Sequence, residues 1–320
     1  MTVSRRGFLG GLVSAALFNR LYGAAKGEPQ LKFGYLSDPH LCRMTPANEV
    51  AFAHALKDFA AANVDAVVVS GDLLDMGTVE EMERLLAVWR AAFPNGQAND
   101  GRPVTPFVVW GNHDYMCASY MRRMTPAQID GAFPHRMMDE KDRWWRELTG
   151  DPFPGEVFHK KIRGFSFVGA HWGHEEETGD WMKAHAADID TSRLFFHVQH
   201  PHPADTVYGD KGGPQLVRKF LSKHSNCLSL SGHSHLSMDH GKALWQGSFA
   251  AMTGSVPANH AAILSVHPDR LVIARRDVKH ACDLPEWVLP LPLAPHADQP
   301  FPFLTQKKHL TFRGGSLHER

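Results

Sequence analysis

The sequence of 320 residues has no excess charge of either sign, because 34 Lys and Arg side chains balance 34 Asp and Glu side chains. A chain without net charge has no overall field that would attract nucleic acid, so we expect no nucleic-acid partner. Cysteine is scarce, and the four cysteines form no Cys-x-x-Cys pair, which argues against a thiolate zinc site. The G-x-S-x-G motif is absent as well, so we do not expect a serine nucleophile of that kind.

The residue that the sequence has in abundance is histidine, which occurs 21 times. Histidine is the commonest metal ligand among side chains, and it changes its charge near neutral pH. Hydrophobic residues make up 43% of the chain and charged residues 21%, which indicates an ordinary globular protein with a sizeable core. The histidines therefore direct the search for function toward a metal site in a folded domain.

The first 25 residues have the pattern of a twin-arginine (Tat) export signal. Arg5 and Arg6 precede an apolar run over residues 7–18, and small residues end at Ala25, where we expect cleavage. The run is too short to cross a bilayer, and no cysteine directly follows the cleavage region, so we expect no stable membrane anchor. Cleavage removes three arginines and no acid, which leaves 34 acidic against 31 basic groups. The pattern predicts a periplasmic or otherwise extracytoplasmic protein, with the Tat translocase as its partner during export.

The rest of the chain is predicted to form a single catalytic domain over residues 26–283. Apolar runs and amphipathic segments alternate along it, which indicates an α/β fold. Residues 115–156 are irregular and rich in methionine and aromatic residues, and we expect them to form a cap insert over the site. Six prolines between Pro285 and Pro302 predict that residues 284–320 are an extended tail.

Short apolar runs predict ten strands: 31–36, 66–70, 107–110, 157–162, 165–170, 194–199, 227–231, 243–249, 261–266 and 271–275. Helices are predicted over 46–62, from a capping box at Thr78 and Glu81 to about Phe93, and around 180–187.

Five polar clusters each follow one of these strand-like runs. They are Asp38-Pro39-His40, Gly71-Asp72-Leu73-Leu74-Asp75, Gly111-Asn112-His113-Asp114, His200-Pro201-His202-Pro203 and Gly232-His233-Ser234-His235. In an open α/β sheet, sites form at the carboxyl ends of the strands, so we expect the clusters to meet there. Carboxylate, amide and imidazole ligands together suit Mn, Fe or Zn.

The series DxH, GDxxD, GNHD, H and GHxH, in this order over about residues 30–280, resembles the calcineurin-like metallophosphoesterase family. The resemblance implies a four-layer αββα sandwich, in which two mixed β-sheets are flanked by helices. It also implies two metal ions and the hydrolysis of a phosphomonoester or phosphodiester, with a water between the two ions as the nucleophile. Met76 stands where protein Ser/Thr phosphatases have an arginine, and Asp75 stands where purple acid phosphatases have a tyrosine ligand. Neither close identity is therefore favoured.

The resemblance assigns a role to individual residues of this chain. Around the first metal it puts four ligands: Asp38, His40, Asp72 and His235. Around the second it puts Asp72 again, as a bridge, with three further ligands: Asn112, His200 and His233. It makes His113 the residue that protonates the leaving group or steadies the phosphoryl group, and Asp75 the residue that orients His113. His200 is preferred for its place at the strand end, and His202 is the substitute.

A small-molecule phosphate ester is the expected substrate, with His202, Tyr208 and Lys211 as candidate contacts. Trp144 and Trp145 are candidates for stacking on a substrate ring, although packing of the cap is favoured. A nuclease or a phospholipid-type phosphodiesterase is the first alternative function. The second is an exported metal-binding module without catalysis, which a missing ligand or a missing His113 would indicate.

Overall fold

The computed structural model describes residues 27–42, 46–115, 135–209, 212–239, 241–257 and 259–293, positions 128, 131 and 295, and strands at 310–313 and 316–319. The predicted signal over residues 1–25 and the candidate contact Lys211 lie outside the described residues. Among the helices that are described, none is both long and apolar enough to cross a membrane.

The first sheet holds the first three strands of the chain side by side and parallel, and antiparallel strands extend it beyond β1. The order is β12-β11-β10-β1-β2-β3, with β13 also paired to β11. Their bounds are β1 Leu31–Leu36, β2 Ala66–Ser70, β3 Thr105–Val109, β10 His260–Val266, β11 Arg270–Asp277, β12 Cys282–Asp283 and β13 Trp287–Pro290. All five residues of β2 are buried, as a continuous β-branched run predicts for a central parallel strand.

The second sheet has the order β4-β5-β6-β7-β9-β8, with parallel pairing from β5 through β9 and antiparallel pairing at both edges. Its strands are β4 Val157–Ile162, β5 Phe165–Ala170, β6 Phe195–Val198, β7 Cys227–Ser231, β8 Leu244–Gln246 and β9 Ala250–Thr253. A separate pair, β14 Leu310–Arg313 and β15 Ser316–Glu319, belongs to neither sheet.

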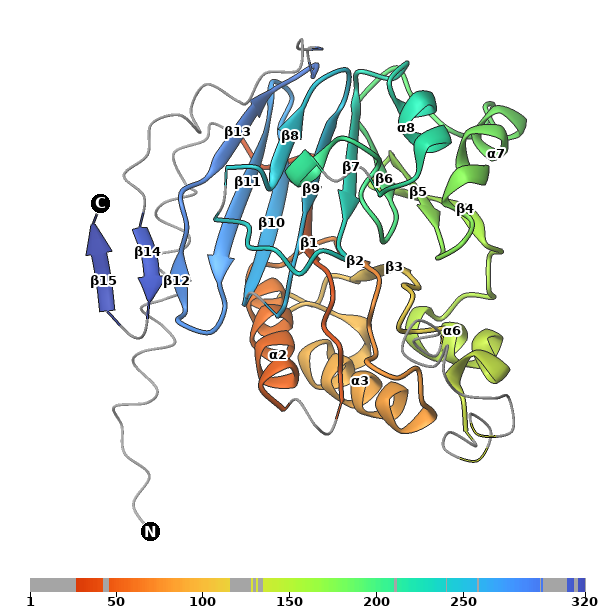
Figure 1. Ribbon diagram of the computed structural model, residues 1–320, viewed down its shortest axis with the longest axis vertical. Helices are drawn as coiled ribbons and strands as arrows, with labels where there is room; N and C mark the ends of the chain where they lie inside the picture. The colour runs from red at the N-terminus through yellow and green to blue at the C-terminus, as the bar shows by residue number, and fades with distance from the viewer. Residues whose placement is uncertain are drawn as a thin grey trace.

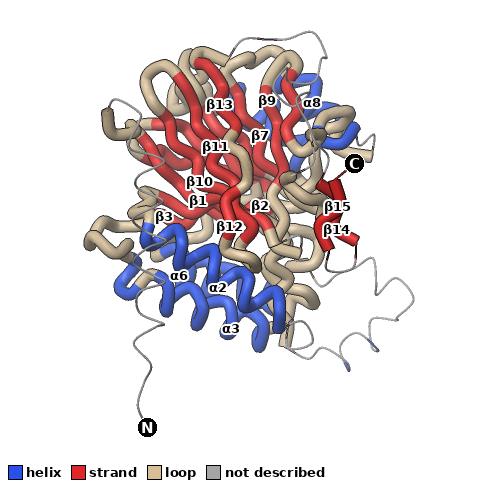
Figure 2. The backbone as a smooth tube through the Cα atoms, turned by 90° about the vertical axis from the view of Figure 1, so that its left-hand side faces the viewer, coloured by secondary structure: helices blue, strands red, loops and turns tan. Residues whose placement is uncertain are grey.

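Helices cover the outer faces of both sheets, so the predicted four-layer sandwich is confirmed (Figure 1 and Figure 2). On the side of the first sheet lie α2 Pro46–Ala61, α3 Val79–Ala92 and α6 Lys141–Thr149, and beside the second sheet lie α7 Thr178–Ala184 and α8 Gln215–Leu221. Short 3₁₀ turns complete the list at Pro94–Gly96, Met137–Glu140, Glu175–Glu177 and Val207–Gly209. The capping box predicted for α3 is present, since Glu81 N–H donates to Thr78 Oγ1 and Thr78 N–H donates to the Glu81 carboxylate.

Aromatic rings fill the space between the two sheets. Phe33 of β1 contacts Phe167 and Phe196 of the second sheet, with ring centroids 5.4 and 4.9 Å apart. Near the carboxyl end of β1, the Tyr35 hydroxyl donates to the Ser231 carbonyl of β7 at 2.5 Å. The sheets are therefore held at a fixed separation next to the edge at which the polar clusters lie.

The structure differs from the sequence prediction at α8, which was not predicted, and in parts of both sheets. The run over 243–249 forms only the short β8, and the chain then turns into β9, which pairs with both β7 and β8. In the cap insert, by contrast, the helix α6 packs against β3 and α3 and buries Trp144 and Trp145, so the packing role favoured for both tryptophans is confirmed. The proline-rich tail begins inside the first sheet, because Trp287 and Leu289 of β13 are buried against β11.

Candidate metal centre

The predicted ligands converge at one edge of the sandwich, where parallel strands of both sheets end. Asp38 and His40 follow β1, Asp72 follows β2 and Asn112 follows β3, so four ligands come from the first sheet. His200 follows β6, and the pair His233 and His235 follows β7, so three ligands come from the second sheet. The site is thus built where the two sheets meet, and each sheet supplies about half of it.

The first group of side chains that could hold a metal consists of Asp38, His40, Asp72 and His235. Their ligand atoms all lie within 4.8 Å of one another. The Nε2 atoms of His40 and His235 are 2.8 Å apart, and Asp72 Oδ2 is 3.5 Å from His40 Nε2. The structure therefore assembles the set that the family resemblance implies for the first ion.

The second group consists of Asp72, His200 and His233. Asp72 Oδ2 lies 2.9 Å from His200 Nε2, which in turn lies 3.2 Å from His233 Nδ1. The amide oxygen of Asn112 is 3.0 Å from His233 Nδ1, so it joins the same cluster. Asp72 is common to both groups, which is the arrangement required of a bridging carboxylate.

Two of the predicted histidine ligands have an oxygen atom behind the ring, which orients the imidazole. His200 Nδ1 lies 2.8 Å from the Ser70 carbonyl oxygen. A carbonyl only accepts, so Nδ1 carries a proton and Nε2 is the ring nitrogen that faces Asp72. His40 Nδ1 similarly lies 3.3 Å from the Asp75 carboxylate, while its Nε2 faces the ligand group. A carboxylate or carbonyl behind a histidine is the usual support for a metal-ligating imidazole.

His113 lies beside the first group, with its ring centroid 4.4 Å from that of His40. Its Nδ1 donates to the Asp75 carbonyl oxygen at 2.7 Å and lies 3.6 Å from the Asp75 carboxylate. Asp75 therefore contacts both imidazoles, and its backbone orients His113 more closely than its side chain does. Burial lowers the pKa of His113, but the hydrogen bond with Asp75 and the charge of Asp72 outweigh burial and raise it above its usual value.

The backbone of the site is strained. Five of the predicted ligands have left-handed φ angles between 42° and 70°: Asp38, His40, Asp72, His233 and His235. Such conformations cost about 1–3 kcal/mol each and are retained where the fold or the function demands them. Two glycines allow the required close approaches, because a Cβ at Gly111 would lie 2.2 Å from Asp72 Oδ1 and one at Gly232 would lie 1.8 Å from Ser37 Oγ.

The charges of the site fit a cation. Asp38 and Asp72 are almost completely buried, and Asp38 Oδ2 has no hydrogen-bond partner among the described residues. Burial opposes ionisation of Asp72, yet the neighbouring His200 and His40 hold its pKa below the usual range. In return, although burial acts in the opposite direction, Asp72 raises the pKa of His200 to about 10. Buried carboxylates that need a positive partner, with imidazole nitrogens directed at the same point, suit divalent or trivalent metal ions.

Asp114 supports the backbone of the site, although the sequence motif assigned it no role. Its buried carboxylate accepts the backbone N–H groups of Gly111, Leu73 and Leu74, at 2.7, 3.3 and 2.9 Å. It thereby ties the loop after β2 to the loop after β3 and fixes Asp72 relative to Asn112. Burial, with the charge of Asp72, raises the pKa of Asp114 to about 7. Its place inside the Gly-Asn-His-Asp cluster is the only signal that the sequence offers.

The candidate substrate contacts are not gathered at the ligand groups. His202 is buried between Ser231 Oγ and Ser234 Oγ, at 2.6 and 2.9 Å, and is not part of either group. The Tyr208 hydroxyl donates to the Ser237 carbonyl oxygen.

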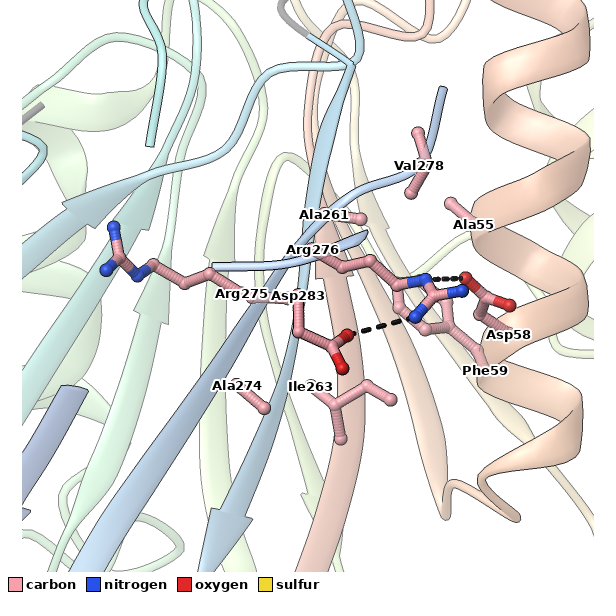
Figure 3. A pocket seen from close by; sticks show the side chains of 11 residues that line it. Ala55, Asp58, Phe59, Ala261, Ile263, Ala274, Arg275, Arg276, Val278 and Asp283 are labelled. Carbon is pink, nitrogen blue, oxygen red and sulfur yellow. Dashed lines mark hydrogen bonds and ion pairs between the residues drawn. The ribbon is translucent and has the colours of Figure 1, made fainter. Parts of the chain in front are cut away.

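A hollow away from the ligand groups lies between α2 and strands β10 and β11, on the outer face of the first sheet (Figure 3). It contains the ion pairs of Arg276 with Asp58 and Asp283.

Two other histidines, His171 and His197, have purely structural surroundings. His171 is fully buried among Trp110, Phe153 and Phe158, and burial lowers its pKa to about 3. It accepts the Trp110 N–H at Nδ1, so it supports the strand end that leads into the Asn112 turn. His197 is also buried, beside Ser229 Oγ, and burial again lowers its pKa to about 3.

The two sheets, their order and the two ligand groups with one shared carboxylate define a class of metal-dependent phosphoester hydrolases. The sequence profile of that class, described as calcineurin-like phosphoesterase, matches residues 31–237. The match covers more than half of the chain, and the chain belongs to the calcineurin-like phosphoesterase family. The protein is therefore a metal-dependent phosphoric ester hydrolase, for which the family implies a centre of two metal ions.

Solved structures share this fold at low sequence identity. A dimetal phosphatase from Danio rerio has a TM-score of 0.52 and 14% identity, over 82% of this chain and 99% of that chain. A purple acid phosphatase from yellow lupin (Lupinus luteus) seeds has a TM-score of 0.52 and 11% identity, over 81% of this chain and 53% of that chain. These similarities establish the fold alone. No curated protein sequence matches the chain significantly.

Proposed function

We propose that the protein hydrolyses small phosphomonoesters or phosphodiesters at a pair of metal ions, drawn from Mn, Fe and Zn. The observation that carries this proposal is the position of Asp72, whose carboxylate belongs to both ligand groups. One buried side chain that contacts both sets of ligands favours two ions at the short separation of known two-metal hydrolases, about 3.5–4 Å.

Asp38, His40 and His235 would complete the first ligand set, and Asn112, His200 and His233 the second. When bound, the two ions would acidify a water molecule and neutralise charge on the phosphoryl group. The chain's own contribution is to hold the ligands rigidly. The Ser70 carbonyl fixes the ring of His200, Asp75 fixes His40, and the Asp114 carboxylate fixes the loop that carries Asp72.

His113 is proposed to assist departure of the leaving group. With its Nδ1 proton donated to the Asp75 carbonyl, Nε2 is the ring atom left to contact the leaving oxygen. General acid assistance of this kind is worth about a hundred- to ten-thousand-fold in rate. Asp75 acts as the positioning residue, because it contacts His113 and His40 at once.

We further propose that the protein is exported through the Tat translocase to the periplasm or another extracytoplasmic compartment. The support is the sequence of the first 25 residues, with Arg5 and Arg6 before the apolar run. Replacing both arginines with lysine is expected to leave the full-length precursor in the cytoplasm when cell fractions are probed by immunoblot. Processed protein in the periplasm of the variant strain would contradict this route.

The hydrolase proposal is tested on the processed protein, purified from a host with a working Tat system, stripped with chelator and reloaded with Mn, Fe or Zn in turn. Hydrolysis of an aryl phosphate or a bis-aryl phosphate should disappear on chelation and return with at least one metal. Inactivity on both esters with every metal would favour the alternative of a metal-binding module without catalysis. Faster cleavage of DNA, RNA or phospholipid vesicles would favour the nuclease or phospholipid-type alternative.

A matched pair of variants tests the role of Asp72. Asp72→Asn should lose both ions, measured by elemental analysis, together with activity. Asp65→Asn removes another buried carboxylate, which receives the Lys32 N–H at 2.8 Å near the opposite end of the parallel strands, and should keep both ions. Full metal content in Asp72→Asn would show that this carboxylate does not bridge.

A further inference from the structure

Trp172 lies beside the candidate metal centre but is not one of the predicted ligands. It is the second residue after β5, and its side chain is half-buried. The centroid of its ring is 5.5 Å from that of His233, at an interplanar angle of 36°, and 6.1 Å from that of His200. Both histidines belong to the second ligand group, so the indole borders that side of the centre.

The loop that carries Trp172 is held by hydrogen bonds from four successive backbone N–H groups. The N–H groups of His171 and Trp172 donate to the carbonyl oxygens of Glu156 and Trp110, both at 2.9 Å. The Gly173 N–H donates to the buried Glu175 carboxylate at 2.9 Å, and the His174 N–H donates to the His171 carbonyl at 3.1 Å. Because Trp110 directly precedes the Gly111-Asn112 turn, this bonding fixes the indole relative to a predicted ligand.

The environment of Trp172 differs from that of the other tryptophans. Five of the eight are buried in the core: Trp89, Trp110, Trp144, Trp145 and Trp287. The remaining two are half-buried and have partners away from the centre, since Trp181 stacks on His185 at 3.9 Å and Trp245 lies against Phe249. Trp172 thus presents a partly uncovered apolar ring, on a rigid loop, next to a cluster of polar ligands.

We propose that Trp172 is a specificity-determining residue, whose ring stacks on a planar aromatic or heteroaromatic group of the phosphoester. The inference rests on the proposed function and narrows its substrate class. A phosphoryl group bound by the second ligand group would lie against His233, and the substituent on its ester oxygen would then reach the neighbouring indole. An indole face accepts any planar π-system, so the preference would be for ring-bearing esters in general and not for one particular ring.

Benzyl phosphate and cyclohexylmethyl phosphate, together with their methyl diesters, test the proposal, since each pair has the same carbon skeleton and differs in the planarity of its ring. The metal-loaded wild-type protein should favour the benzyl ester in kcat/KM. Trp172→Ala should lower kcat/KM for the benzyl ester by about 5- to 150-fold, the range that stacking on an aromatic side chain supplies. The change should appear mainly in KM, because stacking is equal in the ground state and the transition state. Trp172→Phe should keep part of the preference.

Trp181→Ala is the matched control, since it removes a half-buried tryptophan of α7 and should leave the ratio of the two esters unchanged. An equal loss on both esters, or a loss of metal in Trp172→Ala and Trp172→Phe, would show that the indole only supports the imidazoles and would overturn the proposal. A wild-type protein that cleaves both esters equally would also overturn it while leaving the proposed hydrolase function intact. Failure of the wild-type protein to cleave any phosphoester would instead refute the proposed function itself.

Discussion

Adding a single methyl group at Gly111 should disable the metal centre without changing any ligand. The backbone of Gly111 passes so close to Asp72 that an added Cβ would lie 2.2 Å from its Oδ1 and 2.4 Å from its backbone nitrogen. The carboxylate could rotate away, but the backbone nitrogen cannot. In Gly111→Ala the loops after β2 and β3 must therefore move apart by about 1 Å to restore ordinary contact distances.

The size of the effect follows from this displacement. Overpacking of a tight site costs about 1–3 kcal/mol of unfolding free energy. For a domain of this size that cost lowers Tm by roughly 2–4 °C per kcal/mol. A misplacement of about 1 Å at an active site costs about a hundredfold in rate. Because Asp72 belongs to both ligand groups, the content of both ions should fall together.

Three measurements on one preparation test this reasoning: metal content by elemental analysis, kcat on an aryl phosphate, and Tm by calorimetry. Gly131→Ala is the control, since an added Cβ there meets no atom within 4 Å and the residue has no left-handed φ. A Gly111→Ala protein with two ions per chain and undiminished kcat would refute the steric argument, and with it the placement of Asp72 against the Gly111 turn.

Three further predictions concern separate parts of the molecule. His113→Ala should lower kcat by about a hundred- to ten-thousand-fold with unchanged metal content; loss of metal would instead make His113 a ligand. Thr78→Ala removes one half of the α3 capping box and should lower the unfolding free energy in urea by about 0.5–2 kcal/mol with activity intact, and an unchanged urea midpoint would contradict the value assigned to the cap. Burial lowers the pKa of His197 to about 3. Below about pH 6.5 the unfolded chain therefore binds a proton at His197 that the folded chain does not bind, so the free energy of unfolding falls as the pH drops from about 6.5. His197→Gln should flatten this decline by up to about 1.4 kcal/mol per pH unit in urea unfolding, and equal slopes in both proteins would mean that His197 is protonated in the fold.

The fold could be predicted where local sequence and tertiary environment agree. The β-branched run of β2 and the capping box of α3 define their elements without help from distant residues. In contrast, α8 was not predicted, because its first N–H groups are satisfied by Glu176 from another segment and its Leu216 is exposed. Strand β13 was missed as well, because its two prolines, before and at the end of the strand, resemble an extended tail, and only the pairing with β11 makes it a strand.

In the candidate site, too, some features could be predicted from the sequence and others depend on contacts between distant residues. Motif order and spacing were sufficient to predict which side chains lie together in the two ligand groups, including the choice of His200 over His202. The roles of Asp114 and Trp172 depend in part on contacts with Leu74 and His233, which are 40 and 61 positions away, and spacing along the chain does not reveal such contacts. The left-handed backbone at the ligands was likewise not foreseeable, because non-glycine residues adopt it only where surrounding contacts enforce it.

The division of the ligands between the two sheets also makes bound metal a structural cross-link. Ions held jointly by Asp72 and His200 would join β2 to β6, so spreading of this edge of the sandwich would require their release. The aromatic rings between the sheets, such as Phe33 and Phe167, set the separation of the sheets. They thereby set the distance between ligands of the first sheet and ligands of the second sheet, although the rings are not ligands themselves. Removing the ring of Phe196, which packs on Phe33 between the sheets, should weaken metal binding although every ligand remains in place.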